Sequence, residues 1–477
     1  QHNDPSFANV WQELLWRGLV HVSTDEAALE RSLAEEKVTY YCGFDPTAAS
    51  LHLGHLVQLL LMRRLQLAGH HPIGLVGGST GLIGDPRQSS ERVLNSRETV
   101  AQWVDLLRAQ VERFLSFEGE NRAVMVNNLD WTSQLSAIDF LRDIGKHFRV
   151  GTMIKKDIVA KRLNSEEGIS YTEFSYQILQ GLDYLNLYRD HGCTLQTGGS
   201  DQWGNLTSGT DLIRKVEGVA VHAVGTPLIT NSDGTKFGKS EGNAVWLDPE
   251  LTSPYAFYQF WLNTADADVV DRLKVFTFKT RAEIEELARS VEEEPYKRQA
   301  QKVLAWEVNS LVHGEEATEK AIAASAAVFG RGELTELDAE TLDSVARELP
   351  GASVSSGPLQ VADLLVATGL SESKSAARRT LKEGGAYVNN EKVVGEDAEL
   401  GPDQLLHGRW ALLRRGKKHL AAVTAEAEIA APSGDSWGPL DHEGTDVDPQ
   451  RGFPRCGSKV VRARTTPRAV PGITLKA

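Results

Sequence analysis

Two short motifs combine residue types that suit the binding of a triphosphate. The first is the run Tyr41–Thr47 followed by His52-Leu53-Gly54-His55, at the point where a predicted strand leads into a predicted helix. Backbone N–H groups and the positive helix terminus attract anions there, and both imidazoles can face that point. Gly54 would let a flat base approach the backbone. A helix cap with two surface histidines is the alternative interpretation.

The second motif, Lys236 to Ser240, has the sequence KFGKS and follows the last predicted strand. The ammonium groups of Lys236 and Lys239 lie on a loop that contains glycine. They could close over a polyphosphate and neutralise the charge that develops on a departing pyrophosphate. Taken alone, such a segment is more typical of a solvated turn.

One predicted helix carries polar residues on a single face. Tyr176, Gln180 and Asp183 are spaced i, i+4 and i+7, so their side chains point the same way. Apolar neighbours such as Ile178 and Leu182 would pack into the core. The three polar groups would then line a cavity whose occupant must satisfy them. An amphipathic helix with its polar side in solvent is the alternative.

The elements around these motifs predict an α/β fold with a doubly wound parallel sheet of the Rossmann type. Between residues 37 and 225, short apolar runs alternate with helical patterns, the rhythm of parallel strands joined by crossover helices. Strands are expected at 38–42, 73–76, 123–126, 194–197 and 219–224, with a helix at 53–68. From 254 to about 328 the pattern predicts a purely helical region.

Composition narrows the class of protein. The 477 residues are 41% hydrophobic and 24% charged, as in multidomain globular proteins. No apolar run reaches the roughly 18 residues of a membrane span, and the three cysteines show no metal-like spacing. We therefore expect a cytoplasmic protein. The net charge of −14 disfavours broad nucleic-acid binding, so RNA contact must be local, as in the basic segment between Lys374 and Lys418.

Taken together, the order and placement of the two motifs resemble those of the class I aminoacyl-tRNA synthetases. The FG form of the lysine motif, the run Tyr41–Thr47 and the stretch Gly198–Asn205 resemble bacterial tyrosyl-tRNA synthetases in particular. The resemblance extends from about Trp11 to Val423. It implies an ATP-dependent ligase that forms tyrosyl-adenylate and pyrophosphate and then transfers tyrosine to the 3′ end of tRNA(Tyr).

The same resemblance implies roles for individual residues. Tyrosine would be held at its phenol by Tyr41 and Asp183, at its ammonium by Asp85, Tyr176 and Gln180, and otherwise by Asn128 and Gln202. ATP would be bound by Gly43, Asp45, Gly54, Arg92, Asp201 and Ser240, with catalytic contacts from Thr47, His52, His55, Lys236 and Lys239. Attack of a carboxylate on the α-phosphate needs no protein nucleophile, so these groups would align substrates and stabilise charge. Magnesium would accompany ATP, and no carboxylate cluster predicts a dedicated metal site.

One departure from the family pattern concerns the segment 85–92. It is one residue shorter than the commonest bacterial version and lacks that version's lysines. Arg87 and Arg92 keep positive charge in the segment, but how it would touch pyrophosphate is left open.

The carboxy-terminal part contains a basic helix followed by a strand and turn. Lys374, Arg378 and Lys382 share one helical face, with Arg379 beside them, which suits a phosphate backbone. This part resembles an RNA-binding fold shared with a small-subunit ribosomal protein. An exposed, salt-bridged helix is the alternative. The family resemblance also implies a homodimer with one tRNA spanning both subunits, although the sequence itself shows no dimer surface.

These patterns predict five segments along the chain. Residues 1–226 form the catalytic domain with a connective insertion, and 227–335 hold the lysine motif and a helical domain. A linker at 336–356, an RNA-binding domain at 357–424 and a disordered tail at 425–477 follow. Competing functions are a small-metabolite adenylyltransferase, the sister enzyme for tryptophan, and an RNA-binding protein that has lost catalysis. Tyr41 and Asp183 favour a phenol over an indole.

Overall fold

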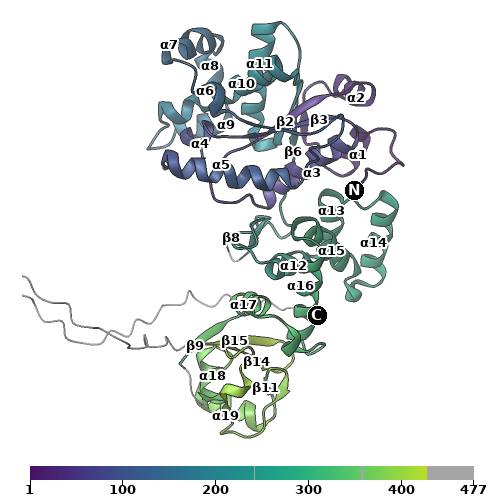
Figure 1. Ribbon diagram of the computed structural model, residues 1–477, viewed down its shortest axis with the longest axis vertical. Coiled ribbons are helices and arrows are strands. Elements are labelled where there is room, and N and C mark those ends of the chain that lie inside the picture. Colours follow the sequence, from purple (N-terminus) through teal and green to yellow (C-terminus); the bar gives the residue numbers. More distant parts are fainter. Residues whose placement is uncertain (241, 356–358, 427–477) are drawn as a thin grey trace, which may run out of the picture. The chain divides into compact units, whose positions relative to one another are not determined.

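The computed structural model describes residues 1–240, 242–355 and 359–426. The chain divides into two compact units, Gln1–Ser325 and Ala326–Ala477 (Figure 1). Within the described residues, no helix is both long enough and apolar enough to cross a membrane. The described cysteines, Cys42 and Cys193, are buried free thiols.

A six-stranded sheet organises the first unit, in the order β1-β6-β5-β2-β3-β4. Its strands are β1 (Val22–Ser23), β2 (Thr39–Phe44), β3 (His71–Val76), β4 (Val124–Asn127), β5 (Leu195–Gly199) and β6 (His222–Thr226). Strands β2 to β6 run parallel, and β1 pairs antiparallel with β6. The predicted doubly wound sheet is confirmed, with each predicted strand present within a few residues. The two-residue β1 was not predicted.

Alternate residues of β2 supply two separate cores. Tyr40, Cys42 and Phe44 join the cluster beneath α3 (Leu53–Leu67) and α5 (Arg97–Glu112), whereas Tyr41 joins the cluster beneath α10 (Tyr171–His191) and α11 (Trp203–Glu217). Figure 1 shows these two helix pairs on opposite faces of the sheet. Since both faces are covered, the strands are apolar almost throughout. Shorter helices complete this part: α1 (Val10–Trp16), α2 (Glu26–Glu35), α4 (Thr80–Ile83), α6 (Leu129–Thr132), α7 (Ala137–Asp139), α8 (Val150–Met153) and α9 (Asp157–Leu163).

The rest of the first unit is helical, as predicted. A short hairpin of β7 (Lys239–Ser240) and β8 (Asn243–Ala244) precedes α12 (Pro254–Leu262), α13 (Asp266–Phe276), α14 (Arg281–Glu293), α15 (Gln299–His313) and α16 (Glu315–Val328). Buried residues such as Phe257, Trp261 and Leu304 belong to the same apolar cluster as α3. The helix that begins at the histidine motif contacts α13 and shares one core with the helices that follow the lysine motif.

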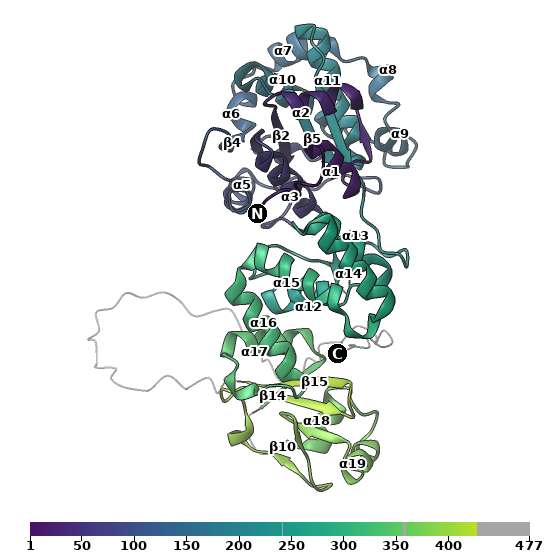
Figure 2. The ribbon, with the colours of Figure 1, turned by 90° about the vertical axis from the view of Figure 1, so that its right-hand side faces the viewer.

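The second unit contains a five-stranded sheet between helices. Its elements are α17 (Ala339–Glu348), β9 (Gly351–Val354), β10 (Leu359–Gln360), α18 (Val361–Ala367), α19 (Lys374–Lys382), β11 (Ala386–Val388), β12 (Glu391–Lys392), β13 (Glu399–Leu400), β14 (Trp410–Arg415) and β15 (His419–Ala425). The sheet order is β12-β11-β14-β15-β9. Figure 2 shows α17 on one side of β14 and β15, with α18 and α19 on the other.

The predicted linker at 336–356 is wrong. This segment carries α17, in which Leu342 and Val345 are buried, and β9, which pairs parallel with β15. Its Gly, Ser and Pro content favoured a loop, but the segment is ordered because β15 offers an edge for β9 to complete. The predicted tail at 425–477 falls almost wholly outside the described residues, except that Ala425 ends β15.

Candidate active site

A cavity of about 500 Å³ opens at the carboxyl ends of β2 and β5. The sheet order changes direction at β2, with β3 on one side and β5 on the other, which is where doubly wound sheets bind ligands. Most of the residues singled out from the sequence line it: Tyr41, Gly43, Asp45, Thr47, His52, Gly54, His55, Asp85, Arg92, Tyr176, Gln180, Asp183, Asp201 and Gln202. Asn128, Lys236, Lys239 and Ser240 do not line it.

Two buried polar residues, Asp183 and Tyr41, line one part of the cavity. The Asp183 carboxylate is 3% exposed and accepts hydrogen bonds from Asn128 Nδ2 at 3.0 Å and Trp131 Nε1 at 2.9 Å. Burial nevertheless raises the pKa of Asp183 to about 7. The Tyr41 hydroxyl is buried and has no hydrogen-bond partner among the described residues. Burial, and then the nearby Asp183 carboxylate, raises the pKa of Tyr41 well above its usual value.

Further along the cavity, the Asp85 carboxylate accepts hydrogen bonds from Gln202 Nε2 at 2.8 Å and Asn205 Nδ2 at 3.0 Å. Burial raises the pKa of Asp85 to about 6, and the negative charge of Asp45 adds to the rise. The Tyr176 hydroxyl donates to Asp45 Oδ2 at 2.5 Å, so its oxygen lone pairs remain free to accept. Since carboxylates share this cavity and repel one another, a ligand with a positive charge would relieve them.

Both histidines of the first motif cap α3. The Gly54 N–H donates to Nδ1 of His52 at 3.0 Å, and the His52 N–H donates to Nδ1 of His55 at 3.1 Å. A Cβ at Gly54 would lie 2.9 Å from the His52 ring, so glycine leaves room for this cap. The alternative interpretation as a helix cap is therefore correct for the Nδ1 atoms, but the rings are half-buried and line the cavity.

Burial fixes the protonation of these rings. It lowers the pKa of His52 to about 4, with help from the charge of Lys239, and the pKa of His55 to about 3. Both imidazoles are neutral at pH 7, and their Nδ1 atoms accept hydrogen bonds. Each must then carry its proton on Nε2. The pair consequently offers two neutral N–H donors rather than two cations.

The lysine motif is anchored by its phenylalanine. Phe237 contacts the rings of Phe260, Trp261 and Phe276, with centroids between 5.5 and 5.9 Å apart, and lines the cavity. Gly238 accepts a hydrogen bond from Val245, whose own carbonyl accepts one from the first residue of α3. Lys236 and Lys239 are exposed, and neither forms an ion pair with another described residue. The loop thus lies near the paired histidines, and neither ammonium group is paired with a carboxylate of the described residues.

The structure adds polar residues that the sequence did not identify. Trp131 binds Asp183, Thr80 donates to Asp45 at 2.6 Å, and Asn205 binds Asp85. Asn128 is fully buried and reaches the cavity only through Asp183 and Thr80. Asn128 was expected at the tyrosine from the family resemblance, but no local pattern singles out Trp131, Thr80 or Asn205, because each is defined by a partner far away in the chain.

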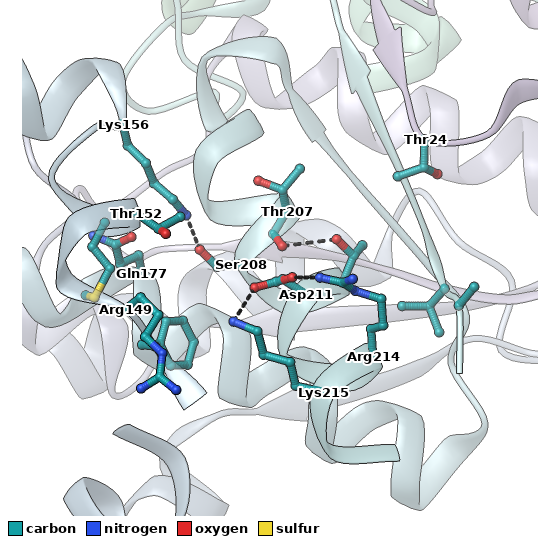
Figure 3. A pocket seen from close by; sticks show the side chains of 15 residues that line it. Thr24, Arg149, Thr152, Lys156, Gln177, Thr207, Ser208, Asp211, Arg214 and Lys215 are labelled. Carbon is teal, nitrogen blue, oxygen red and sulfur yellow. Dashed lines mark hydrogen bonds and ion pairs between the residues drawn. The ribbon is translucent and has the colours of Figure 1, made fainter. Parts of the chain in front are cut away.

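A second cavity, of about 460 Å³, lies between α8, α10 and α11 (Figure 3). Arg149, Lys156, Arg214 and Lys215 give it positive charge, although Asp211 pairs with the last two. Lys156 donates hydrogen bonds to the Gly204 carbonyl and the Ser208 hydroxyl. Burial lowers the pKa of Lys156 to about 8.

In the second unit, the four basic residues predicted to bind RNA lie on α19. Ala377 and Leu381 are buried on one side of this helix, and Lys374, Arg378, Arg379 and Lys382 are exposed. Lys374 pairs with Asp363 at 2.8 Å, and Lys382 lies 3.9 Å from Glu396. The two arginines form no ion pair with a described residue.

Comparison with known proteins agrees with this geometry. A family model described as class I tRNA synthetases (W and Y) matches residues 33–330, and one for the C-terminal domain of tyrosine–tRNA ligases matches 341–423. The tyrosine–tRNA ligase of Leifsonia xyli is 70% identical over 430 residues, covering 90% of this chain and 97% of that protein. The Streptomyces avermitilis ligase is 64% identical over 416 residues, covering 87% and 98%.

Among solved structures, a C-terminally truncated mitochondrial tyrosyl-tRNA synthetase of Aspergillus nidulans matches with a TM-score of 0.61 and 28% identity. The match covers 66% of this chain and 93% of that one. Fold and site thus define a class I aminoacyl-tRNA synthetase. Within that class, the chain belongs to the tyrosine–tRNA ligase family.

Proposed function

We propose that the chain ligates tyrosine to tRNA(Tyr) in two steps at the first cavity. ATP first activates the tyrosine carboxylate as tyrosyl-adenylate with release of pyrophosphate, and a hydroxyl at the 3′ end of the tRNA then takes the tyrosyl group with release of AMP. The observation that carries this proposal is the buried Tyr41 hydroxyl, which lies near the Asp183 carboxylate and has no hydrogen-bond partner in the part of the chain that the structure describes. Buried polar groups require partners. The phenol of a bound tyrosine can donate to the Asp183 carboxylate while it accepts from the Tyr41 hydroxyl.

The position of the remaining groups fits the rest of a tyrosine molecule. Asp85 offers its negative charge, and Tyr176 an oxygen lone pair, to the substrate ammonium, with Gln180 on the same helix face. Gln202, which donates to Asp85, would lie near the substrate carboxylate. An ammonium in this place would also reduce the repulsion between Asp85 and Asp45.

ATP would bind at the mouth, with its base and ribose near Gly43, Gly54 and Asp201. The substrate carboxylate attacks the α-phosphorus, the bond to the β-phosphate oxygen breaks, and pyrophosphate leaves. Thr47 and the Nε2–H groups of His52 and His55 would hold the leaving phosphates from one side. Lys236 and Lys239, with Ser240, would close from the other side and stabilise the growing charge.

Magnesium would enter with the nucleotide. Mg²⁺ is usually held by substrate phosphates and water with few protein ligands. Within the described residues, no group of three or more His, Cys, Asp or Glu side chains is arranged to hold a metal ion. The protein residues named above would then act on the phosphates directly.

The tRNA would be bound locally rather than over the whole acidic chain. The exposed face of α19 offers Arg378 and Arg379 without competing carboxylates among the described residues, so phosphates can pair with them. Within the first unit, the basic side chains of the second cavity provide another place for a phosphate backbone.

The homodimer implied by the family also has support in the first unit. Between α7 and the start of α10, the chain exposes apolar side chains that a monomer would leave in water: Ile138, Leu141, Val150, Ile154, Leu163 and Tyr171. Ile138 and Tyr171 are 69% and 65% exposed. Such a concentration of exposed apolar residues is typical of a protein interface.

Aminoacylation of purified tRNA tests the proposal. We expect labelled tyrosine to become acid-precipitable only when ATP and tRNA(Tyr) are both present. Replacement of Arg378 and Arg379 by alanine should raise KM for tRNA while tyrosyl-adenylate formation remains unchanged. Charging of tRNA with tryptophan instead of tyrosine would contradict the proposal.

A further inference from the structure

Arg162, near the end of α9, donates hydrogen bonds to acceptors in three separate segments. Its side chain is 1% exposed. It contacts the Gly168 carbonyl at 3.1 Å, the Arg87 and Ser90 carbonyls at 3.1 and 3.0 Å, and the carboxylates of Glu173 and Glu91 at 2.6 Å each. Only arginine offers enough N–H donors in a planar fork to serve such a set, because a lysine ammonium has three.

Most of these contacts fall on the segment 85–92, the shortened loop without lysines. Glu173, also 1% exposed, continues the network by accepting the backbone N–H of Arg92 at 2.5 Å. The Arg92 side chain donates from Nε to the Asp85 carbonyl at 2.7 Å and lines the cavity. The loop is therefore fastened at Arg87, at Ser90 and Glu91, and at Arg92.

The Asp85 end of the loop, which faces the proposed tyrosine site, is held by residues outside the arginine network. The Asp85 carboxylate is held by Gln202 and Asn205, which do not touch the arginine network. Arg92 bonds to neither Gln202 nor Asn205; its backbone N–H is held by Glu173 of the network, and its side chain is held only by the Asp85 carbonyl within the same loop, among the described residues. Loss of the network should therefore displace Arg92 more than the Asp85 carboxylate.

Resting on the function proposed above, we propose that Arg162 is a positioning residue for the activation step. It fixes the segment 85–92 so that the Arg92 guanidinium faces the phosphates of ATP. Arg162 itself does not reach the cavity lining and acts only through Arg92.

A double-mutant cycle tests this assignment by tyrosine-dependent exchange between pyrophosphate and ATP. Arg162→Lys should lower kcat/KM for ATP about 10- to 100-fold, since small misplacements remote from the reacting atoms have effects of that size. The KM for tyrosine should stay within about twofold. In an Arg92→Ala background, the same substitution should change kcat/KM for ATP by less than about threefold, because its target is already gone.

If Arg162→Lys fails to fold, a substitution at the more exposed partner Glu91 tests the same assignment. Glu91 is 42% exposed, and Glu91→Gln should lower kcat/KM for ATP about two- to fivefold, again only when Arg92 is present. Glu112→Gln is the matched control, since Glu112 is 41% exposed and pairs with Arg108 at 3.0 Å away from the cavity lining. This control should leave all kinetic constants unchanged, and thermal unfolding should show that each variant is folded at the assay temperature.

Three results would overturn the assignment: no loss of kcat/KM for ATP, equal losses with and without Arg92, or a parallel loss for tyrosine and ATP. If the unmodified chain shows no tyrosine-dependent exchange, the proposed function itself fails. Failure of the Arg162 assignment alone would leave exchange by the unmodified chain intact.

Discussion

Replacement of Asp183 by alanine should collapse the preference for tyrosine over phenylalanine. Asp183 is a buried charged acceptor in the cavity lining, and the nearby Tyr41 hydroxyl has no hydrogen-bond partner among the described residues. In the unmodified chain, phenylalanine would leave the buried Tyr41 hydroxyl without a partner among the described residues, and it would offer no hydrogen bond to the buried Asp183 carboxylate. The alanine variant removes that penalty for phenylalanine and removes the acceptor for tyrosine, so the two effects act on the ratio in the same direction.

The expected magnitude follows from the chemistry of the bond. A hydrogen bond to a charged group contributes about 1.5–3 kcal/mol, and about 1.4 kcal/mol corresponds to a factor of ten. The ratio of kcat/KM for tyrosine to that for phenylalanine should fall about 10- to 150-fold. The comparison belongs at pH 8, because the pKa of Asp183 is about 7 and its carboxylate is mostly ionised there.

Pyrophosphate exchange with tyrosine and with phenylalanine measures the ratio. Two further variants test whether the loss of any buried tyrosine hydroxyl has the same effect. Tyr41→Phe should lower the ratio in the same direction. Tyr184→Phe should not, although Tyr184 lies against Tyr41 with ring centroids 5.3 Å apart, because its hydroxyl is bonded to the His222 carbonyl at 2.7 Å instead of being free. An unchanged ratio in Asp183→Ala would remove Asp183 from the tyrosine pocket.

Three other predictions concern charge and assembly. The kcat/KM for tyrosine should fall as pH drops from 8 to 5, because Asp183 and Asp85, with pKa values of about 7 and 6, are ionised only above those values; a flat profile would contradict this. Each of the substitutions Lys236→Ala and Lys239→Ala should slow tyrosyl-adenylate formation about 100-fold in rapid-quench experiments. If either variant also binds tyrosine more weakly in a fluorescence titration, the lysines do not act on the phosphates alone. Tyr171→Glu should halve the mass measured by light scattering, whereas a monomeric unmodified chain would exclude the dimer.

The sequence predicted the sheet well because β2 and β3 are buried on both faces and therefore apolar almost throughout. The first motif and the stretch Gly198–Asn205 both lie where parallel strands end: Asp45 directly follows β2, and Gln202 lies three residues beyond β5. Asp183 was found because its helix carries an unusual polar stripe. These inferences depend only on local periodicity and on the geometry of parallel strands.

Contacts between distant segments could not be predicted in this way. Trp131 and Asn128 meet Asp183 across more than 50 residues, and nothing in their local sequence indicates a carboxylate partner. Arg162 similarly lies on a short helix with an ordinary basic composition. The segment around β9 was mistaken for a linker because its pairing with β15 is a property of the assembled sheet and not of its own residues.

The most direct test of the central claim is pyrophosphate–ATP exchange with the unmodified chain and each of the twenty amino acids in turn. The cavity between Asp183, the paired histidines and the lysine loop predicts strong exchange with tyrosine and very weak exchange with phenylalanine and tryptophan. Exchange that is supported by tryptophan but not by tyrosine, or that does not depend on any amino acid, would contradict it.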